Sequence, residues 1–429
     1  MQEEYLHYLW RLKRLPLHNL TLTDGRTVEV HNTGWYNLDA GPDFFNGTVS
    51  LDGMRWSGNI ELHVKSSDWY VHNHHHDKAY ENVVLHVVYE HDKEVIVNGE
   101  KLPTLELKDI IDINHWRNYD RITSRPYEIA CSAEMPIDNF IIEQQLSVSL
   151  FQRLERKGME LVNFLRDDQH DKKKALLIAV LQSFGGRANK LPMIELAHII
   201  PLRIIAKEKW SIERIESIVF GCAGMLNNKK NRCDQYTKQL KIDWNHLKLK
   251  YNLPEMNVSS WKFSGMRPYS FPSIRLAQLS ALLYHWNLSL SDPTDAEIIV
   301  AELNSKFQLP VSKYWENHFV LGSESNPHNA KISSNTFNLV LINGIVPYLI
   351  YLKHLEHNFE YSDAVINLLE HLPPESNNIT KKWSNLGIKP KNAAESQGMI
   401  ELKNEFCNFK KCLSCKIGHH VLETEVEYS

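Results

Sequence analysis

The sequence has little cysteine and no long apolar run. Its 429 residues include six cysteines, too few for a disulfide framework, which fits a reducing compartment. A membrane-spanning helix needs about eighteen consecutive apolar residues, and the chain has no such run. It starts Met-Gln-Glu-Glu, where a secretory signal carries basic residues. We therefore expect a cytoplasmic protein with no membrane partner.

The chain also lacks an excess of basic residues. It has 48 Lys and Arg against 52 Asp and Glu, a net charge of −4. Nucleic-acid binding would therefore need a local basic patch, because the global charge provides no attraction. A chain of 429 residues is long enough for two or three domains, and its 43% of hydrophobic residues is enough to form their cores.

The strongest chemical signal lies in residues 41–92. In residues 59–65, apolar residues alternate with Glu61, His63 and Lys65. The side chains of a strand alternate between its two faces, so these three ionisable groups share one face. An acid, an imidazole and an amine in register indicate a site, although half-solvated antiparallel strands without a site show the same alternation.

A second acid precedes this strand. Asp52-Gly53 is typical of a tight hairpin, so Asp43 begins the strand that pairs with the strand of Glu61. Two acids on neighbouring strands can bind one divalent cation through their oxygens. We expect Asp43 and Glu61 to hold Mg²⁺ or Mn²⁺, while His63 or Lys65 positions or activates a water.

Pro42-Asp43 followed by Glu61-x-His63 resembles the P-D…(D/E)-x-K core of the restriction-endonuclease-like superfamily. The resemblance implies a helix, three antiparallel strands, a helix and a further strand, and metal-dependent hydrolysis of DNA or RNA. A helix pattern over residues 3–15 and an apolar strand over residues 83–89 agree with that order.

The sequence departs from this core at one catalytic position. His63 stands where the superfamily has Lys, and Lys65 could supply the missing amine. The alternative is a catalytically degenerate protein that only binds nucleic acid or acts as a scaffold.

A histidine-rich stretch follows, with four histidines between Asp68 and Asp77. Imidazoles at this spacing can bind a transition metal or act as general acids. These residues predict a second site formed by His72, His74 and Asp77. A protein that used this site would be a histidine-metal hydrolase, which is a further alternative. An exposed turn without chemistry would have the same composition. His86, inside the apolar strand, is expected to be a hydrogen-bonded core histidine.

The remaining chain has helical periodicity from Asp138 onward. We predict an α+β protein with a restriction-endonuclease-like mixed sheet in residues 1–125, a larger irregular helical domain in residues 137–400 and a C-terminal tail in residues 401–429. Within the helical domain, Arg267 and Arg275 lie beside aromatic residues. Such arginines can bind phosphate and stack on bases, or they can cap neighbouring helices.

The tail carries Cys407, Cys412 and Cys415. Thiolates at such spacing are good ligands for a structural zinc ion or an iron–sulfur cluster. The fourth ligand is open between His419, His420 and Cys131, and unliganded packed cysteines are the alternative.

Several phrases of the chain also resemble a narrower family. They include Gly41-Pro42-Asp43-Phe44, Asp68-Trp69, Arg267-Pro268 and the terminal cysteine motif with Ile417-Gly418. Together they resemble the bacterial domain-of-unknown-function family 2851, over nearly the whole chain. That resemblance implies no activity, so the functional argument rests on the site itself.

Overall fold

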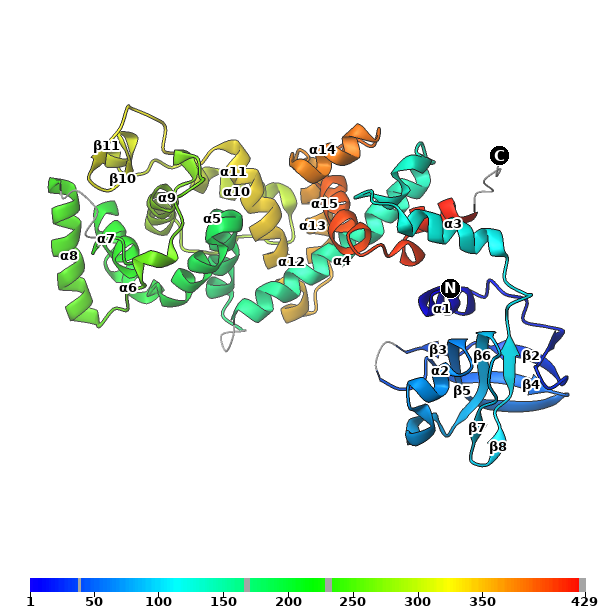
Figure 1. Ribbon diagram of the computed structural model, residues 1–429. Coiled ribbons are helices and arrows are strands. Elements are labelled where there is room, and N and C mark those ends of the chain that lie inside the picture. Colours follow the sequence, from blue (N-terminus) through cyan, green and yellow to red (C-terminus); the bar gives the residue numbers. More distant parts are fainter. Residues whose placement is uncertain (38–39, 166–169, 228–233, 424–429) are drawn as a thin grey trace. The chain divides into compact units, whose positions relative to one another are not determined.

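The computed structural model describes residues 1–37, 40–165, 170–227 and 234–423. The chain forms two compact units, Met1–Ile141 with Glu405–Ser429, and Ile142–Asn404. The first unit contains a mixed sheet and the second contains mostly helices (Figure 1). The α+β class with a larger helical region is therefore confirmed. The C-terminal segment packs with the first unit.

The sheet of the first unit has the strand order β1-β2-β4-β5-β6-β9, with β3 paired to β4. Neighbouring strands are antiparallel from β1 to β5, whereas β6 is parallel to β5 and β9 is parallel to β6. The strands are β1 (Leu20–Thr21), β2 (Thr27–Asn32), β3 (Trp35–Tyr36), β4 (Phe44–Leu51), β5 (Met54–Lys65), β6 (Val83–Glu90) and β9 (Thr104–Glu106). A separate hairpin pairs β7 (Ile96–Val97) with β8 (Glu100–Lys101).

The predicted hairpin at Asp52-Gly53 is confirmed as the connection between β4 and β5. Both residues have positive φ, 47° and 82°. A tight hairpin turn that matches the twist of its strands needs such angles, and Asp and Gly tolerate them. The turn sets the register that brings the start of β4 beside the middle of β5.

The first unit also contains helical segments. They are α1 (Glu3–Arg11), α2 (Asp68–Val71), η1 (His74–His76), η2 (Lys78–Tyr80), α3 (Ile113–Ser124), η3 (Ala130–Glu134), η9 (Cys412–Ser414) and α16 (Lys416–Glu423). The buried face of α1 carries Tyr5, Leu6, Leu9 and Trp10. Both α1 and α2 pack against β5, so they cover the strand that carries Glu61.

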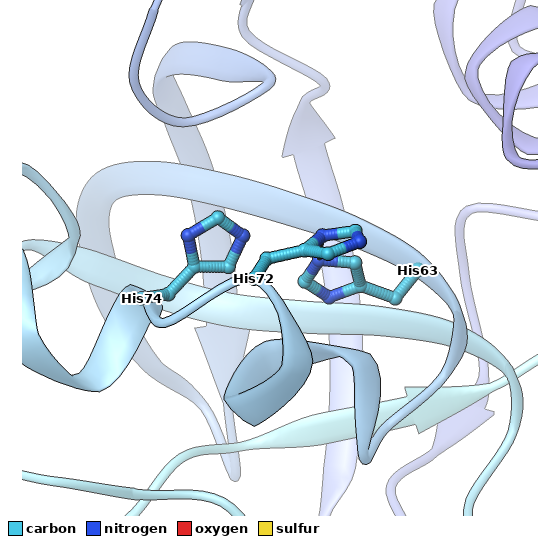
Figure 2. A group of neighbouring side chains, drawn as sticks. All are labelled: His63, His72 and His74. Atoms are coloured by element: carbon cyan, nitrogen blue, oxygen red, sulfur yellow. Dashed lines mark hydrogen bonds between the residues drawn. The ribbon is translucent and has the colours of Figure 1, made fainter.

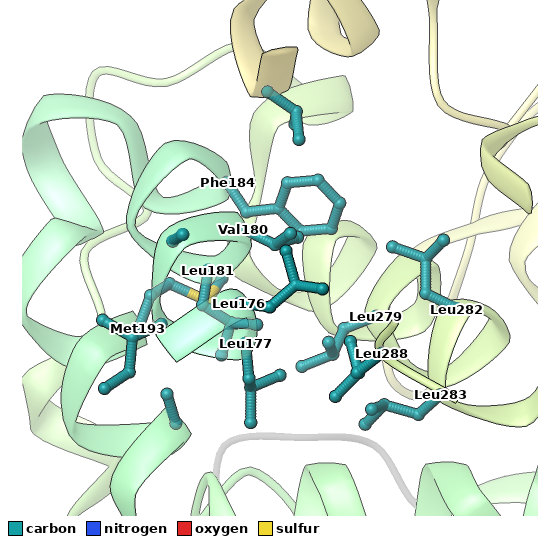
Figure 3. Packing of buried hydrophobic residues seen from close by; sticks show 14 of the residues in the cluster. Leu176, Leu177, Val180, Leu181, Phe184, Met193, Leu279, Leu282, Leu283 and Leu288 are labelled. Carbon is teal, nitrogen blue, oxygen red and sulfur yellow. The ribbon is translucent and has the colours of Figure 1, made fainter. Parts of the chain in front are cut away.

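The second unit is built from twelve main helices in its described residues. They are α4 (Asn139–Leu165), α5 (Lys172–Ile199), α6 (Leu202–Lys207), α7 (Ile212–Cys222), α8 (Gln235–Tyr251), α9 (Pro272–His285), α10 (Ala296–Phe307), α11 (Ser334–Val340), α12 (Val346–Glu356), α13 (Glu360–His371), α14 (Asn378–Asn385) and α15 (Ala393–Glu401). Leucines of α5 and α9 pack around Phe184 and Met193 in its core (Figure 3). The chain leaves helical geometry inside α5 at Gly186, where φ is 51°.

One helical stretch of the described chain, Ser334–Glu356, is long and apolar enough to cross a membrane. Its most apolar window is 72% buried inside the protein. The core helix of a folded domain has the same character, so this stretch is weak evidence for a membrane span.

A buried ion pair in the second unit gives a test of its packing. The Glu401 side chain is 2% exposed and accepts hydrogen bonds from Arg153 and Arg156, at 3.3 and 2.5 Å to Oε2. Replacing Glu401 by Gln removes a buried negative charge that both guanidinium groups contact. We expect a loss of roughly 3 kcal/mol in the free energy of unfolding, the low end for a broken buried pair because Arg156 is partly exposed.

Denaturant unfolding measures this loss. The matched control is Glu143→Gln. Glu143 forms an ion pair with Lys391 that joins similarly distant parts of the sequence, but this pair lies on the surface, where both side chains are more than half exposed. Solvent screens such a pair, so we expect little change. Equal effects of the two substitutions would contradict the assignment of Glu401 as a buried structural charge.

Candidate active site

The two acids singled out in the sequence lie side by side. The backbone N–H of Asp43 donates to Oε2 of Glu61 at 3.0 Å, and the N–H of Leu62 donates to Oδ2 of Asp43 at 2.9 Å. Each carboxylate is therefore held by the backbone of the opposite strand. The structure brings this predicted pair together where the start of β4 lies beside the middle of β5.

A β-bulge places Asp43 on the same face of the sheet as Glu61. Phe44 pairs with Ile60 and Gly47 pairs with Gly58, so β4 has one extra residue between these two pairs. Without that residue, Asp43 would lie opposite Leu62 and its side chain would point to the other face. Bulges redirect side chains in this way and are common beside active sites.

Glu61 is buried, with a residue exposure of 4%. Burial and the nearby charge of Asp43 raise the pKa of Glu61 to about 9, although the hydrogen bond from the Asp43 backbone acts in the opposite direction. The carboxyl group therefore holds a proton at neutral pH unless a cation takes its place. Two adjacent carboxylates in a buried position are the arrangement that a bound divalent cation stabilises.

His7 of α1 completes one side of the site. Its Nε2 lies 3.2 Å from Oδ2 of Asp43. Burial alone would lower the pKa of His7, but the contact and charge of Asp43 raise it above its ordinary value. Sequence reasoning missed His7. The signal was available, since Glu3, His7 and Trp10 follow helical spacing and share the buried side of the expected helix.

Three histidines form the other side of the site. His63 projects from β5, His72 follows α2, and His74 begins η1 (Figure 2). One ring nitrogen from each histidine lies within 4.8 Å of the other two. Among the described residues, this is the one group of three such side chains that could hold a metal ion. Nε2 of His74 lies 3.3 Å from Oε1 of Glu61, and Nε2 of His63 lies 3.6 Å from the same oxygen. The histidines and the acid pair therefore form one cluster.

His63 is the centre of a chain of imidazoles. Its Nδ1 lies 2.9 Å from Nε2 of His86, and its Nε2 lies 3.2 Å from Nδ1 of His72. Burial, followed by the neighbouring histidines, lowers the pKa of His63 to about 2, and burial lowers that of His86 to about 3. Both rings are therefore neutral at physiological pH, which is the form that binds metals. His86 is hydrogen-bonded and fully buried, as expected, and it also orients His63.

Two nitrogens of the cluster lack a hydrogen bond. Nε2 of His7 and Nε2 of His74 are buried without a well-directed partner, although each faces a carboxylate oxygen. Buried polar atoms are seldom left in this state. A shared proton or a cation would satisfy each of these nitrogen–oxygen pairs.

Other predicted residues lie outside the cluster. Lys65 is exposed at the end of β5, and its N–H donates to Oδ2 of Asp68 at 2.9 Å. Asp77 caps η2 by accepting from Ala79 N–H at 2.9 Å. In the second unit, Arg267 is exposed. The mostly buried Arg275 donates to Gln278 Oε1 at 2.8 Å, and burial lowers its pKa to about 10.

Comparison with known proteins adds a family assignment. A family model described as protein of unknown function (DUF2851) matches residues 3–378. The match confirms the resemblance to this family and includes the phrases at Gly41, Asp68 and Arg267, whereas the terminal cysteine motif lies beyond the matched residues. No curated protein and no solved structure matches the chain.

The raised pKa of Glu61 predicts how stability depends on pH. Between its ordinary value of 4.5 and about 9, the folded metal-free protein holds a proton that the unfolded chain releases. Stability is therefore highest below the lower value and falls as pH rises toward the upper one. Glu61→Gln mimics the protonated acid, so we expect its melting temperature in EDTA to rise increasingly above that of the wild type as pH increases from 4.5 to about 9.

Thermal melts over a pH series test this expectation. Glu29→Gln is the control, because Glu29 lies exposed on β2 of the same sheet and should follow the wild type throughout. At pH values below the ordinary pKa of Glu61, all three proteins should melt together. A Glu61→Gln profile parallel to the wild type at every pH would show that Glu61 ionises normally.

Proposed function

We propose that this chain, which belongs to the DUF2851 family of proteins of unknown function, is a metal-dependent nuclease that hydrolyses phosphodiester bonds of DNA or RNA. The observation that carries the proposal is the convergence of Asp43 and Glu61, each bonded to the other strand. Paired carboxylates of this kind commonly bind the catalytic divalent cation in enzymes that hydrolyse phosphodiester bonds.

The order of elements supports the same proposal. Helix α1 precedes the antiparallel strands β2, β4 and β5, and short helical turns then lead to β6, which is parallel to β5. The resemblance to the restriction-endonuclease-like superfamily implies this order. Asp43 directly precedes the second of these antiparallel strands and Glu61 lies in the third, as the P-D…(D/E)-x-K pattern implies.

The ligand set favours Mn²⁺ over Mg²⁺. Asp43 and Glu61 offer oxygens, and His7 and His74 offer buried nitrogens beside them. Carboxylate oxygens suit both cations, whereas imidazole ligands shift the preference toward transition metals. A divalent cation held here would stabilise charge on a phosphate and lower the pKa of a water molecule.

His63 and Lys65 have different proposed roles. His63 is buried, neutral and fixed by His86, so it orients the groups around Glu61 rather than titrating near its ordinary pKa. Lys65 is exposed on the same face of β5, where its ammonium group can meet the phosphate of a substrate. A cation placed beside the developing charge of a phosphoryl group stabilises the transition state.

The histidine group supports a second candidate, a histidine-metal hydrolase. His63, His72 and His74 offer three nitrogens within 4.8 Å, and three histidines with an open fourth position are a known catalytic zinc arrangement. A third candidate is a degenerate protein that binds nucleic acid without cleaving it. These candidates differ in which substitutions remove activity.

A cleavage assay on mixed DNA and RNA substrates tests the nuclease. We expect Asp43→Asn and Glu61→Gln each to reduce Mn²⁺-dependent cleavage by about two orders of magnitude or more, because each removes an anionic ligand. Glu29→Gln should keep wild-type activity. Cleavage that survives in both site variants would overturn the assignment of Asp43 and Glu61, and a wild type inactive with every divalent metal would favour the binding-only alternative.

Kinetics of His72→Ala and Lys65→Ala separate the remaining roles. For the nuclease, His72→Ala should retain measurable activity with Mn²⁺, whereas for the histidine-metal hydrolase it should abolish activity with zinc. Lys65→Ala should raise KM more than it lowers kcat if the amine binds substrate phosphate in the ground state. An equal loss in kcat and kcat/KM would instead place the amine in the transition state.

A further inference from the structure

Four cysteines of the first unit belong to two distant parts of the chain. Cys131 lies in η3, and Cys407, Cys412 and Cys415 lie in the C-terminal segment. Cys131 and Cys415 are buried, with exposures of 9% and 8%. Helix α16 packs against both η3 and η9, so the fold brings the two parts together.

The thiols are close enough to affect one another. After burial, the charges of Cys415 and Cys412 are the largest causes that raise the pKa of Cys131, to about 12. Burial and the charge of Cys415 likewise raise the pKa of Cys412 to about 11. These thiols therefore lie near one another, as the packing of α16 against η3 and η9 requires.

The backbone around Cys415 is shaped to hold a thiolate. The N–H groups of Ile417 and Gly418 donate to its sulfur and oppose the rise of its pKa. Hydrogen bonds to a ligand sulfur are a usual feature around thiolate-bound metals. A Cβ on residue 418 would lie 2.1 Å from the carbonyl oxygen of Cys412, so glycine is required where the chain folds back.

We propose that Cys131, Cys407, Cys412 and Cys415 form a transition-metal centre with four thiolate ligands. Each thiol releases its proton to solvent as its sulfur binds the metal. Cys407 belongs to the same turn as Cys412, since the N–H of Lys411 donates to the carbonyl of Phe406 at 3.0 Å. Among the described residues, no three of these sulfurs lie within 4.8 Å of one another.

The packing of the first unit favours Cys131 as the fourth ligand. Nε2 of His419 lies 2.7 Å from the carbonyl oxygen of Leu413, so this nitrogen carries a hydrogen, and only Nδ1 of the ring has a lone pair for a metal. Cys131 instead offers a buried sulfur whose electrostatic neighbours are Cys412 and Cys415.

The centre would anchor the C-terminal segment to the first unit. Other contacts already hold the C-terminal segment to the first unit. Lys410 Nζ donates to the carbonyls of Thr123 and Arg125, and Arg14 forms an ion pair with Glu423. A bond between distant parts of a chain restricts the unfolded state, so its loss lowers stability. This role is separate from the chemistry proposed at Asp43 and Glu61.

Metal analysis of the full chain, purified without oxygen or chelator, tests the proposal. We expect either about one zinc per chain or iron with acid-labile sulfide and a brown colour, lost in Cys131→Ser, Cys412→Ser and Cys415→Ser. Cys222→Ser is the matched control, because Cys222 is equally buried but lies in α7 of the second unit. A wild type with neither metal, or a Cys131→Ser variant with full content, overturns the centre.

A measurement on the wild type avoids dependence on the folding of the variants. Chelator treatment should make four additional thiols reactive and should increase hydrogen exchange in α3, η3 and α16 while α12 and α13 stay protected. Unchanged thiol reactivity after chelation overturns the proposal. Asp43→Asn and Glu61→Gln should retain the thiolate-bound metal, so failure of the nuclease assignment and failure of this centre give different results.

Discussion

The pair of backbone hydrogen bonds that joins Asp43 to β5 and Glu61 to β4 is the constraint on which the rest of the site depends. It holds two carboxyl groups together in a place where water reaches little of either. Two negative charges so close together repel each other, so the pair of carboxyl groups requires a proton or a bound cation. The raised pKa of Glu61 is the metal-free protein's response to this requirement.

The histidines around the acid pair follow from the same constraint. His7 and His74 each bring a nitrogen to a carboxylate oxygen, from α1 and from the turn after α2. Behind them, His86 fixes His63, which in turn contacts His72. Groups that orient metal ligands in this way usually tune the metal as well. Position 63 therefore carries a neutral imidazole that is fixed on both sides by other imidazoles.

The first unit is completed by both ends of the chain. Helix α1 covers the strand of Glu61, and α16 packs beside α3 and η3. Tyr8 of α1 contacts the ring of His419, so the two ends also meet each other. The site and the cysteine cluster therefore lie in one unit, although the helical unit separates their residues in the sequence.

Local features of the sequence were enough to predict several parts of this structure. Asp52-Gly53 predicted the hairpin because its backbone angles are possible for few other residues, and the alternation around Glu61 predicted the strand and the shared face of Glu61 and His63. Helical periodicity after Asp138 predicted the helical region. Each of these signals depends on neighbours a few residues apart, which the sequence shows directly.

Only the tertiary structure determined which other side chains and helices contact the predicted site residues. The bulge that turns Asp43 toward Glu61 depends on the pairing of two strands, and the burial of Glu61 and His63 depends on helices that pack over a face expected to be open. His7 and Cys131 approach their partners from distant segments, as His86 does from β6. Such contacts arise from the packing of the whole unit, so the spacing of residues along the chain does not predict them.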